Sequence, residues 1–210
     1  MDEAEMSRRM KDTLKLNLDC SSPPSFASII KAAECLCADM GADRLFAPYL
    51  DLLLLGGYLS LTGQDYRIPL KMAESLADCL EALRHRDPIV RCVALDVLYA
   101  LWLTRDQMKG ILEQVLLGER DREVLITAIV VTGCEFHGTR DREIGKLLAR
   151  IVTDASWGEE YKRLSVYQAL LRVAGRPLEE LVRVSDEYRK KRRPLDEIVD
   201  HSLLEEFLNA

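Results

Sequence analysis

Apolar residues recur along most of the chain at the three- and four-residue spacing of an α-helix. The strict alternation typical of β-strands does not persist, and Gly and Pro fall between the long periodic stretches. This pattern predicts an all-α fold. The expected helices cover residues 25–39, 43–61, 69–85, 88–103, 105–117, 121–136, 141–154, 158–174, 177–192 and 195–208.

The segment 88–103 shows the helical pattern most clearly. Asp87 occupies an N-cap position and Pro88 the first helical position, where the missing N–H of proline costs nothing. A second, partly apolar face indicates that several neighbouring helices cover this one. The main apolar face, which we expect to be buried, consists of Val90, Ala94, Val97, Leu98 and Leu101.

Two later segments begin in the same way, at Asp121 and at Glu159. The steps from Asp87 to Asp121 and from Asp121 to Glu159 are 34 and 38 residues, and such periods are typical of helical repeat arrays. Each helix pair of an array buries its apolar face against the next pair. The sequence therefore predicts about five stacked helix pairs over residues 23–210, preceded by an N-terminal arm over residues 1–22.

Residues 87–95, with the sequence Asp-Pro-Ile-Val-Arg-Cys-Val-Ala-Leu, resemble the second helix of a HEAT repeat. That helix commonly begins with Asp, followed by Val-Arg and an Ala-rich apolar face. The resemblance implies a HEAT-like, armadillo-type α-solenoid, which is a right-handed α-α superhelix of about five stacked helix pairs.

The same resemblance implies polar ladders between neighbouring repeats. Asp87 and Arg91 would take part in such a ladder, and Glu159 with Arg163 would occupy the same two places further along the chain. Leu125 stands where the intervening repeat would carry its Arg, so a continuous ladder is not expected.

Composition narrows the class of protein. Hydrophobic residues make up 48% of the chain, which is enough for a continuous core and too much for a disordered chain. The net charge of −6 argues against a nucleic-acid backbone as the main partner, because phosphate binding needs concentrated Lys and Arg. An acidic chain favours a basic protein partner.

Segments that would direct the chain to a membrane are not expected. Met1 to Lys15 is charged throughout, and the most apolar run, Leu50 to Leu61, is too short to span a bilayer. The six scattered cysteines fit a reducing cytoplasm better than a disulfide framework. We therefore expect a cytoplasmic protein with structural thiols.

Candidate catalytic and metal-binding groups are isolated from one another. His85, His137 and His201 have no second ligand at helical spacing, and Cys134 with His137 lacks a third orienting group. The sequence predicts no catalytic residue, no metal site and no cofactor. The basic run Arg189 to Arg193 is interpreted as a solvated helix end before Pro194, with a binding patch as the alternative.

These observations predict a non-enzymatic interaction scaffold or adaptor that binds a protein partner through the second helices of its pairs. A narrower version is an inhibitor or immunity-type protein that neutralises one toxin. The alternatives are a nucleic-acid-binding protein resembling the DNA alkylation-repair glycosylases and a HEAT-like lyase of the kind that attaches bilins. The expected contact residues are Asp96, Tyr99, Trp157 and Tyr161.

Overall fold

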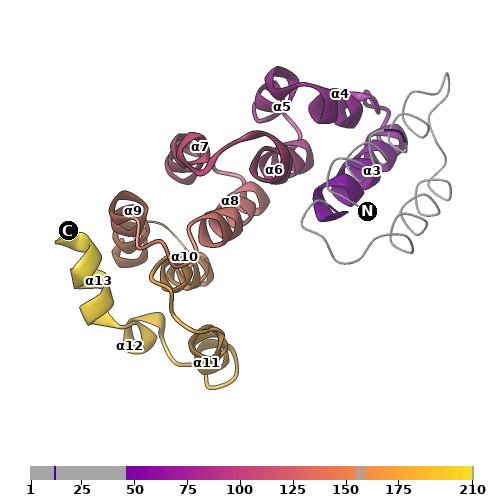
Figure 1. Cartoon of the computed structure of the whole chain (residues 1–210). Helices are drawn as coiled ribbons and strands as arrows, with labels where there is room; N and C mark the ends of the chain where they lie inside the picture. The colour runs from indigo at the N-terminus through magenta and orange to yellow at the C-terminus, as the bar shows by residue number, and fades with distance from the viewer. Residues whose placement is uncertain (1–11, 13–45, 155–156, 158, 210) are drawn as a thin grey trace. The chain divides into compact units, whose positions relative to one another are not determined.

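The computed structural model describes residues 12, 46–154, 157 and 159–209 of the chain. Within these residues the chain forms eleven α-helices and one π-helical turn, without a strand (Figure 1). The all-α fold class is thus confirmed. The helix expected over residues 25–39 lies outside the described residues, as does the predicted N-terminal arm apart from residue 12. The chain divides into two compact units, residues 1–103 (unit 1) and 104–210 (unit 2).

The described part of unit 1 consists of four α-helices and the π-helical turn. They are α3 (Phe46–Leu61), α4 (Ile68–Glu74), α5 (Leu76–Ala82), α6 (Pro88–Val97) and η1 (Leu98–Trp102). Helix α3 packs against α4 and α6, while α5 packs against α6. The core includes Leu52, Leu53 and Leu59 of α3, each of which is 0% exposed. Apolar burial between these helices is the main stabilising force of the unit.

The single helix expected over residues 69–85 is wrong, because the chain breaks at Ser75. This residue has an extended backbone, and its hydroxyl accepts a hydrogen bond from the backbone N–H of Asp78. Serine favours this N-cap geometry over a helix interior, since its short side chain replaces a missing backbone acceptor. One helix ends and a second begins at the same residue.

The predicted core face of residues 88–103 is confirmed at four of its five positions. Val90, Ala94, Val97 and Leu98 are each 0% exposed, whereas Leu101 is half-buried. The cause is the π-helical turn that replaces the last part of the expected α-helix. A π-turn contains more residues per turn than an α-helix, so Leu101 no longer follows the α-helical face.

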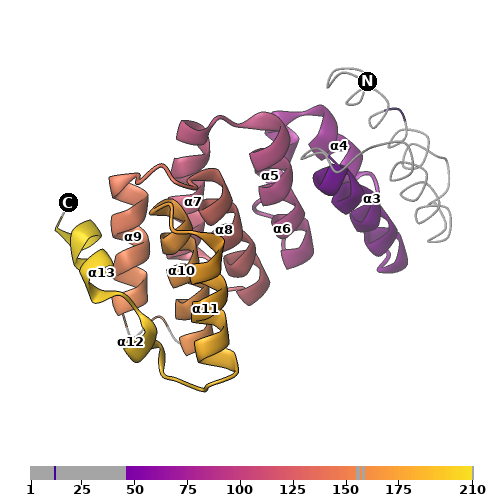
Figure 2. The same cartoon turned by 60° about the horizontal axis from the view of Figure 1, so that its bottom comes forward.

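Unit 2 contains seven helices among its described residues. They are α7 (Arg105–Gly118), α8 (Arg122–Glu135), α9 (Arg142–Thr153), α10 (Glu160–Val173), α11 (Leu178–Arg189), α12 (Leu195–Ile198) and α13 (His201–Leu208). Helices α7, α9 and α13 form one layer, and α8, α10 and α11 form the other (Figures 1 and 2). Helix α10 packs against α8 and α9, so it is the central element of the unit.

Aspartate side chains cap three of the seven helix starts in the described part of unit 2. Asp121, Asp141 and Asp200 each accept hydrogen bonds from two backbone N–H groups in the first turn of α8, α9 and α13. The cap at Asp200 explains why the single helix expected over residues 195–208 is wrong: the chain starts a new helix there. Glu159 occupies the N-cap of α10, but its side chain makes no capping hydrogen bond.

Arg91 and Arg163 play similar roles at the end of the helix that precedes their own. The Nη1 atom of Arg91 donates to the backbone carbonyl of His85 at 2.8 Å, just beyond α5. The Nε atom of Arg163 donates to the carbonyl of Val152 at 2.7 Å, in the last turn of α9. The Arg163 guanidinium therefore satisfies a carbonyl at the negative end of the α9 dipole, whereas Arg91 satisfies a carbonyl in the connection between α5 and α6.

None of the described helices is both long and apolar enough to cross a membrane.

Candidate functional site

Unit 2 carries a groove of about 360 Å³ on the surface formed by α8, α10 and α11. These helices are neighbours in that order (Figures 1 and 2). Helix α10 forms the floor, and its contributing residues follow the helical spacing of one face. They are Tyr161, Ser165, Gln168, Ala169 and Arg172. Ligand pockets usually measure roughly 300–1,000 Å³, so the groove lies at the lower end of that range.

The two walls of the groove expose large apolar side chains. Val130 of α8 is 55% exposed, and Leu178 and Val182 of α11 are 68% and 53% exposed. The remaining large apolar side chain exposed in the described part of unit 2, Leu117, lies on α7 away from the groove. Exposed apolar surface gathered in one place marks an interaction site more strongly than the same residues scattered singly.

Tyr161 lies at one end of the groove between two arginines. The guanidinium carbon of Arg122 is 5.6 Å from the centre of the Tyr161 ring, and that of Arg189 is 5.8 Å from it. Arg122 is the first residue of α8 and Arg189 the last residue of α11. These cation–π contacts place two positive charges around one aromatic ring.

Arg172 lies at the other end of the groove floor, against α8. Its Nη1 atom is 3.5 Å from the sulfur of Cys134. A Cβ atom added at Gly133 would lie 3.0 Å from the Arg172 side chain and 3.2 Å from the backbone of Ala169. Glycine at position 133 therefore allows α8 and α10 to approach closely, which positions Arg172.

Arg172, which lines the groove, and the two arginines beside Tyr161 lack carboxylate partners among the described residues. Arg122, Arg172 and Arg189 form no ion pair with any carboxylate in the described part of the chain. Several other arginines of unit 2 are paired, including Arg163 with Asp196 and Arg176 with Asp200. The groove thus combines apolar walls with nearby positive charge that no carboxylate of the described residues neutralises.

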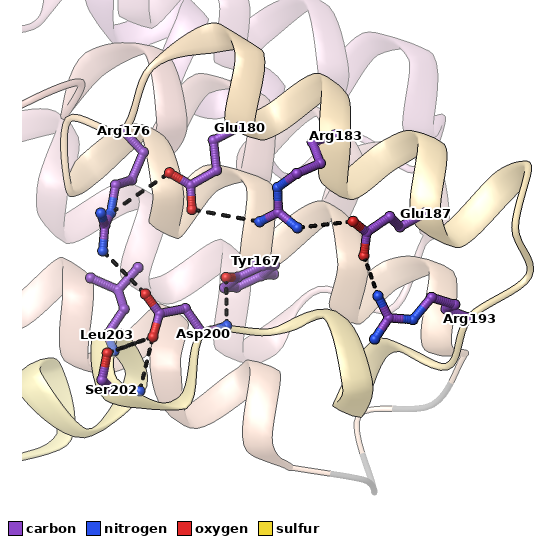
Figure 3. Close-up of polar contacts among 9 residues, drawn as sticks. All are labelled: Tyr167, Arg176, Glu180, Arg183, Glu187, Arg193, Asp200, Ser202 and Leu203. Carbon is purple, nitrogen blue, oxygen red and sulfur yellow. Dashed lines mark hydrogen bonds and ion pairs between the residues drawn. The ribbon is translucent and has the colours of Figure 1, made fainter.

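The face of α11 opposite the groove carries a chain of ion pairs (Figure 3). Glu180 lies between Arg176 and Arg183, and Glu187 lies between Arg183 and Arg193 at N–O distances of 3.1 and 2.7 Å. The hydrogen bond from Arg183 lowers the pKa of Glu187, which is only 8% exposed. The carboxylate is therefore held in its charged form.

The same polar network connects α11 to α10 and to the start of α13 (Figure 3). The Nη2 atom of Arg176 is 3.2 Å from the carboxylate of Asp200, the N-cap of α13. The backbone N–H of Asp200 donates to the hydroxyl oxygen of Tyr167 at 2.8 Å. Tyr167 belongs to α10 and is fully buried. The outer wall of the groove is thus attached to the central helix through charged and polar contacts.

The basic run 189–193 ends α11 and precedes Pro194, as predicted. Its members have separate roles. Lys190 pairs with Asp186 at 2.9 Å, and Arg193 pairs with Glu187. Arg189 instead contacts the Tyr161 ring. The run is therefore a partly neutralised helix end of which one residue, Arg189, contacts the groove residue Tyr161.

The four expected contact residues are divided between the two units. Tyr161 lines the groove. Trp157 is half-buried and precedes α10, so it does not share a helix face with Tyr161 although the two are four positions apart. Asp96 and Tyr99 belong to unit 1, where the π-helical turn that starts at Leu98 also removes the simple α-helical relation between them.

Asp96, an expected contact residue, is a half-buried carboxylate in α6 rather than a freely exposed side chain. Burial raises the pKa of Asp96 to about 7, and the negative charge of Asp51 on α3 adds to the shift. Burial likewise raises the pKa of Asp51. Near neutral pH, Asp96 is thus close to half protonated, which reduces the repulsion within this carboxylate pair.

Comparison with protein-family models, with curated protein sequences and with solved structures finds no match to this chain. The groove, with its charges and its exposed apolar residues, is therefore the basis for assigning a function.

The described histidines and cysteines have individual partners or lie at the surface. The Nδ1 atom of His85 accepts a hydrogen bond from the backbone N–H of Asp87, while His137 is exposed and the Cys134 sulfur contacts Arg172. Burial raises the pKa of the Cys79 thiol to about 12, which makes it a poor nucleophile. No group of three or more His, Cys, Asp or Glu among the described residues is arranged to hold a metal ion.

A second hollow, of about 900 Å³, lies over α4 and α5 in unit 1. It is larger than the groove, but its lining mixes both signs of charge, with Lys71 and Arg84 beside Asp78 and Glu81. Leu80, at 37% exposed, is the most exposed large apolar residue of its walls. We favour the groove of unit 2 as the functional site because its apolar exposure is greater and its charge has one sign.

Several groove residues were not predicted from the sequence. Leu178 and Val182 are four positions apart, so their shared face was available as a signal. The place of Val130 and Arg172 in the groove could not be predicted, because the residue pattern of a single helix does not show which helices pack beside it. Their role depends on the packing of α8, α10 and α11.

Proposed function

We propose that the chain is a non-enzymatic interaction scaffold or adaptor, and that it binds a protein partner in the groove of unit 2. The observation that carries this proposal is the gathering of Val130, Leu178 and Val182, all more than half exposed, on the walls of one groove. Covering such surface with a partner removes it from water, and this is the usual driving force of protein association.

The packing of unit 2 supports the HEAT-like part of the proposal. Helices α7 and α8 form one pair and α9 and α10 the next, with α8 packed on α10 and α7 beside α9. Stacked pairs of this kind are the building unit of α-solenoids. We extend the proposal to a cytoplasmic solenoid, for which the two pairs of unit 2 are the structural support.

The groove modifies the expectation about which helices bind. Helices α8 and α10 are the second members of their pairs, as predicted for the binding face. The outer wall, however, is α11, the first helix of the following pair. The proposed binding surface is therefore formed by two second helices and the helix that follows them in the chain.

Affinity capture followed by titration with the purified partner tests the proposal. Val130→Ser and Val182→Ser together remove apolar surface from both walls, and we expect the dissociation constant to rise about tenfold or more, since central apolar contacts dominate binding energy. Leu117→Ser is the matched control because Leu117 is 70% exposed on α7, outside the groove. Equal affinities for the groove variant and the wild type would contradict the proposal, as would turnover of a small molecule by the purified chain.

The inhibitor or immunity-type version of this function uses the same groove and predicts that the captured partner is a toxic enzyme. The nucleic-acid alternative makes a different prediction. A protein that binds the phosphate backbone loses affinity steeply as salt rises, with a slope set by the number of phosphates contacted. Titration of DNA at several salt concentrations therefore separates the two classes of function.

A further inference from the structure

We infer that the groove of unit 2 accepts an amphipathic helix whose apolar face is flanked at both ends by carboxylates. This inference rests on the proposed function and specifies the chemistry of the partner. It differs from the basic partner that the acidic composition of the chain favours.

The charges at the groove determine the sign of the charge that we expect on the partner. Arg122 and Arg189 flank Tyr161 at one end, and Arg172 lies at the other. None of the three is paired with a described carboxylate. Guanidinium groups bind carboxylates through two parallel hydrogen bonds. Charges further away than about 8 Å are largely screened at physiological salt, so these local arginines outweigh the net charge of the whole chain.

The length of the groove determines the spacing of the carboxylates. Tyr161 and Arg172 are eleven positions apart on α10, and a helix rises 1.5 Å per residue, so the charged ends are about 16 Å apart. A partner helix lying along α10 spans the same distance with acidic residues at i and i+11. Its apolar residues at i+4, i+7 and i+8 then face the exposed side chains of the walls.

The backbone chemistry of the walls favours a helix over an extended peptide. An extended segment obtains its affinity mainly from hydrogen bonds with a sheet edge. The groove is formed by α8, α10 and α11 alone, whose backbone groups are already bonded within each helix. A bound helix satisfies its own backbone and needs only apolar contacts and charge pairs from the groove.

The walls also favour a protein over a nucleic acid. Tyr161 is the single aromatic residue among the described lining residues, while both walls are largely aliphatic. Nucleic-acid channels combine several stacking platforms with a continuous basic track. One ring and arginines confined to two ends fit the apolar face of a helix with charged termini better.

Two synthetic helical peptides test the inference on the full chain. The first carries Glu at i and i+11 with Leu at i+4, i+7 and i+8, and the second replaces both Glu by Lys. We expect fluorescence anisotropy to show at least about tenfold tighter binding of the acidic peptide at physiological salt. Arg122→Gln combined with Arg189→Gln should reduce that preference to about twofold. Arg150→Gln, an exposed arginine on α9 outside the groove, is the matched control, and circular dichroism verifies that all variants are folded.

Four results would overturn the inference. They are an acidic peptide that does not bind at millimolar concentration, equal or tighter binding of the Lys peptide, displacement of the peptide by DNA, and a second copy of the chain occupying the groove in sedimentation experiments. The proposed function is tested separately. It is supported if the peptides fail to bind while the affinity of a captured partner still depends on Val130 and Val182. It is contradicted if substitution of both valines leaves that affinity unchanged.

Discussion

Asp96 shows how one side chain links burial to pH. Its pKa of about 7 in the folded state, raised by burial and by Asp51, exceeds the value of about 3.9 expected in an unfolded chain. The folded state therefore binds this proton more tightly than the unfolded state does. The contribution of Asp96 to the free energy of unfolding consequently falls as pH rises between about 4 and 7, and it does not recover above that range.

The substitution Asp96→Asn removes this ionisation without much change in shape. We expect it to stabilise the protein at pH 8 by an amount on the order of a few kcal/mol and to have a much smaller effect at pH 4. Urea denaturation at the two pH values measures the difference. The same change in unfolding free energy at both pH values would contradict the prediction.

Gly145 tests the packing of α9 against α13. A Cβ atom at this position would lie 2.1 Å from the ring of Phe207, so Gly145→Ala forces the helices apart. Overpacking of this kind costs about 1–3 kcal/mol, and we expect a matching loss in the free energy of unfolding. Gly110→Ala in α7 is the control, since nothing lies within 4 Å of its added Cβ and alanine favours a helix by about 1 kcal/mol. The reverse order of stability would show that α13 does not pack as described.

Residues such as Gly145 limit what a sequence can predict. The caps at Asp87 and Asp121 were predictable because a side chain bonds with backbone groups two or three positions away. Gly145 requires knowledge of Phe207, which is 62 positions further along the chain. Interactions between residues close in the chain could be predicted from the sequence, whereas contacts between distant residues could not.

At the scale of elements, the helical type of the elements followed from periodicity, but their number did not, because breaks divide two of the predicted helices. Ser75 and Asp200 both start a helix inside a stretch that was predicted to be continuous. Both are strong N-cap residues, so a closer weighing of capping would have located the two breaks. The π-helical turn at Leu98–Trp102 has no comparable sequence signal.

That turn gives a prediction for a pair of leucines on one element. Leu98 is 0% exposed, and Leu98→Ala should cost about 2–5 kcal/mol through lost burial and a residual cavity. Leu101→Ala should cost clearly less, because the turn leaves Leu101 half-buried. Guanidinium denaturation of the two variants provides the comparison. Equal losses would mean that the original α-helical face continues through the turn.

At the scale of the molecule, the groove of unit 2 emerges only when three helices meet. Val130 and Val182 are 52 positions apart, and each is merely an exposed apolar residue on its own helix. Their packing around α10 converts them into facing walls. Tyr161 was predicted as a contact residue from its aromatic character, but its arginine neighbours come from the ends of two other helices.

Helix α11 carries two chemically separate faces, and this has a consequence for how such a sequence diverges. One face carries the ion pairs among Glu180, Arg183 and Glu187, while the other presents Leu178 and Val182 to the groove. Under the proposed function, mutations on the second face alter the choice of partner and leave the ion pairs of the first face intact. The proposal therefore lets descendants of this sequence exchange partners while they inherit the same fold.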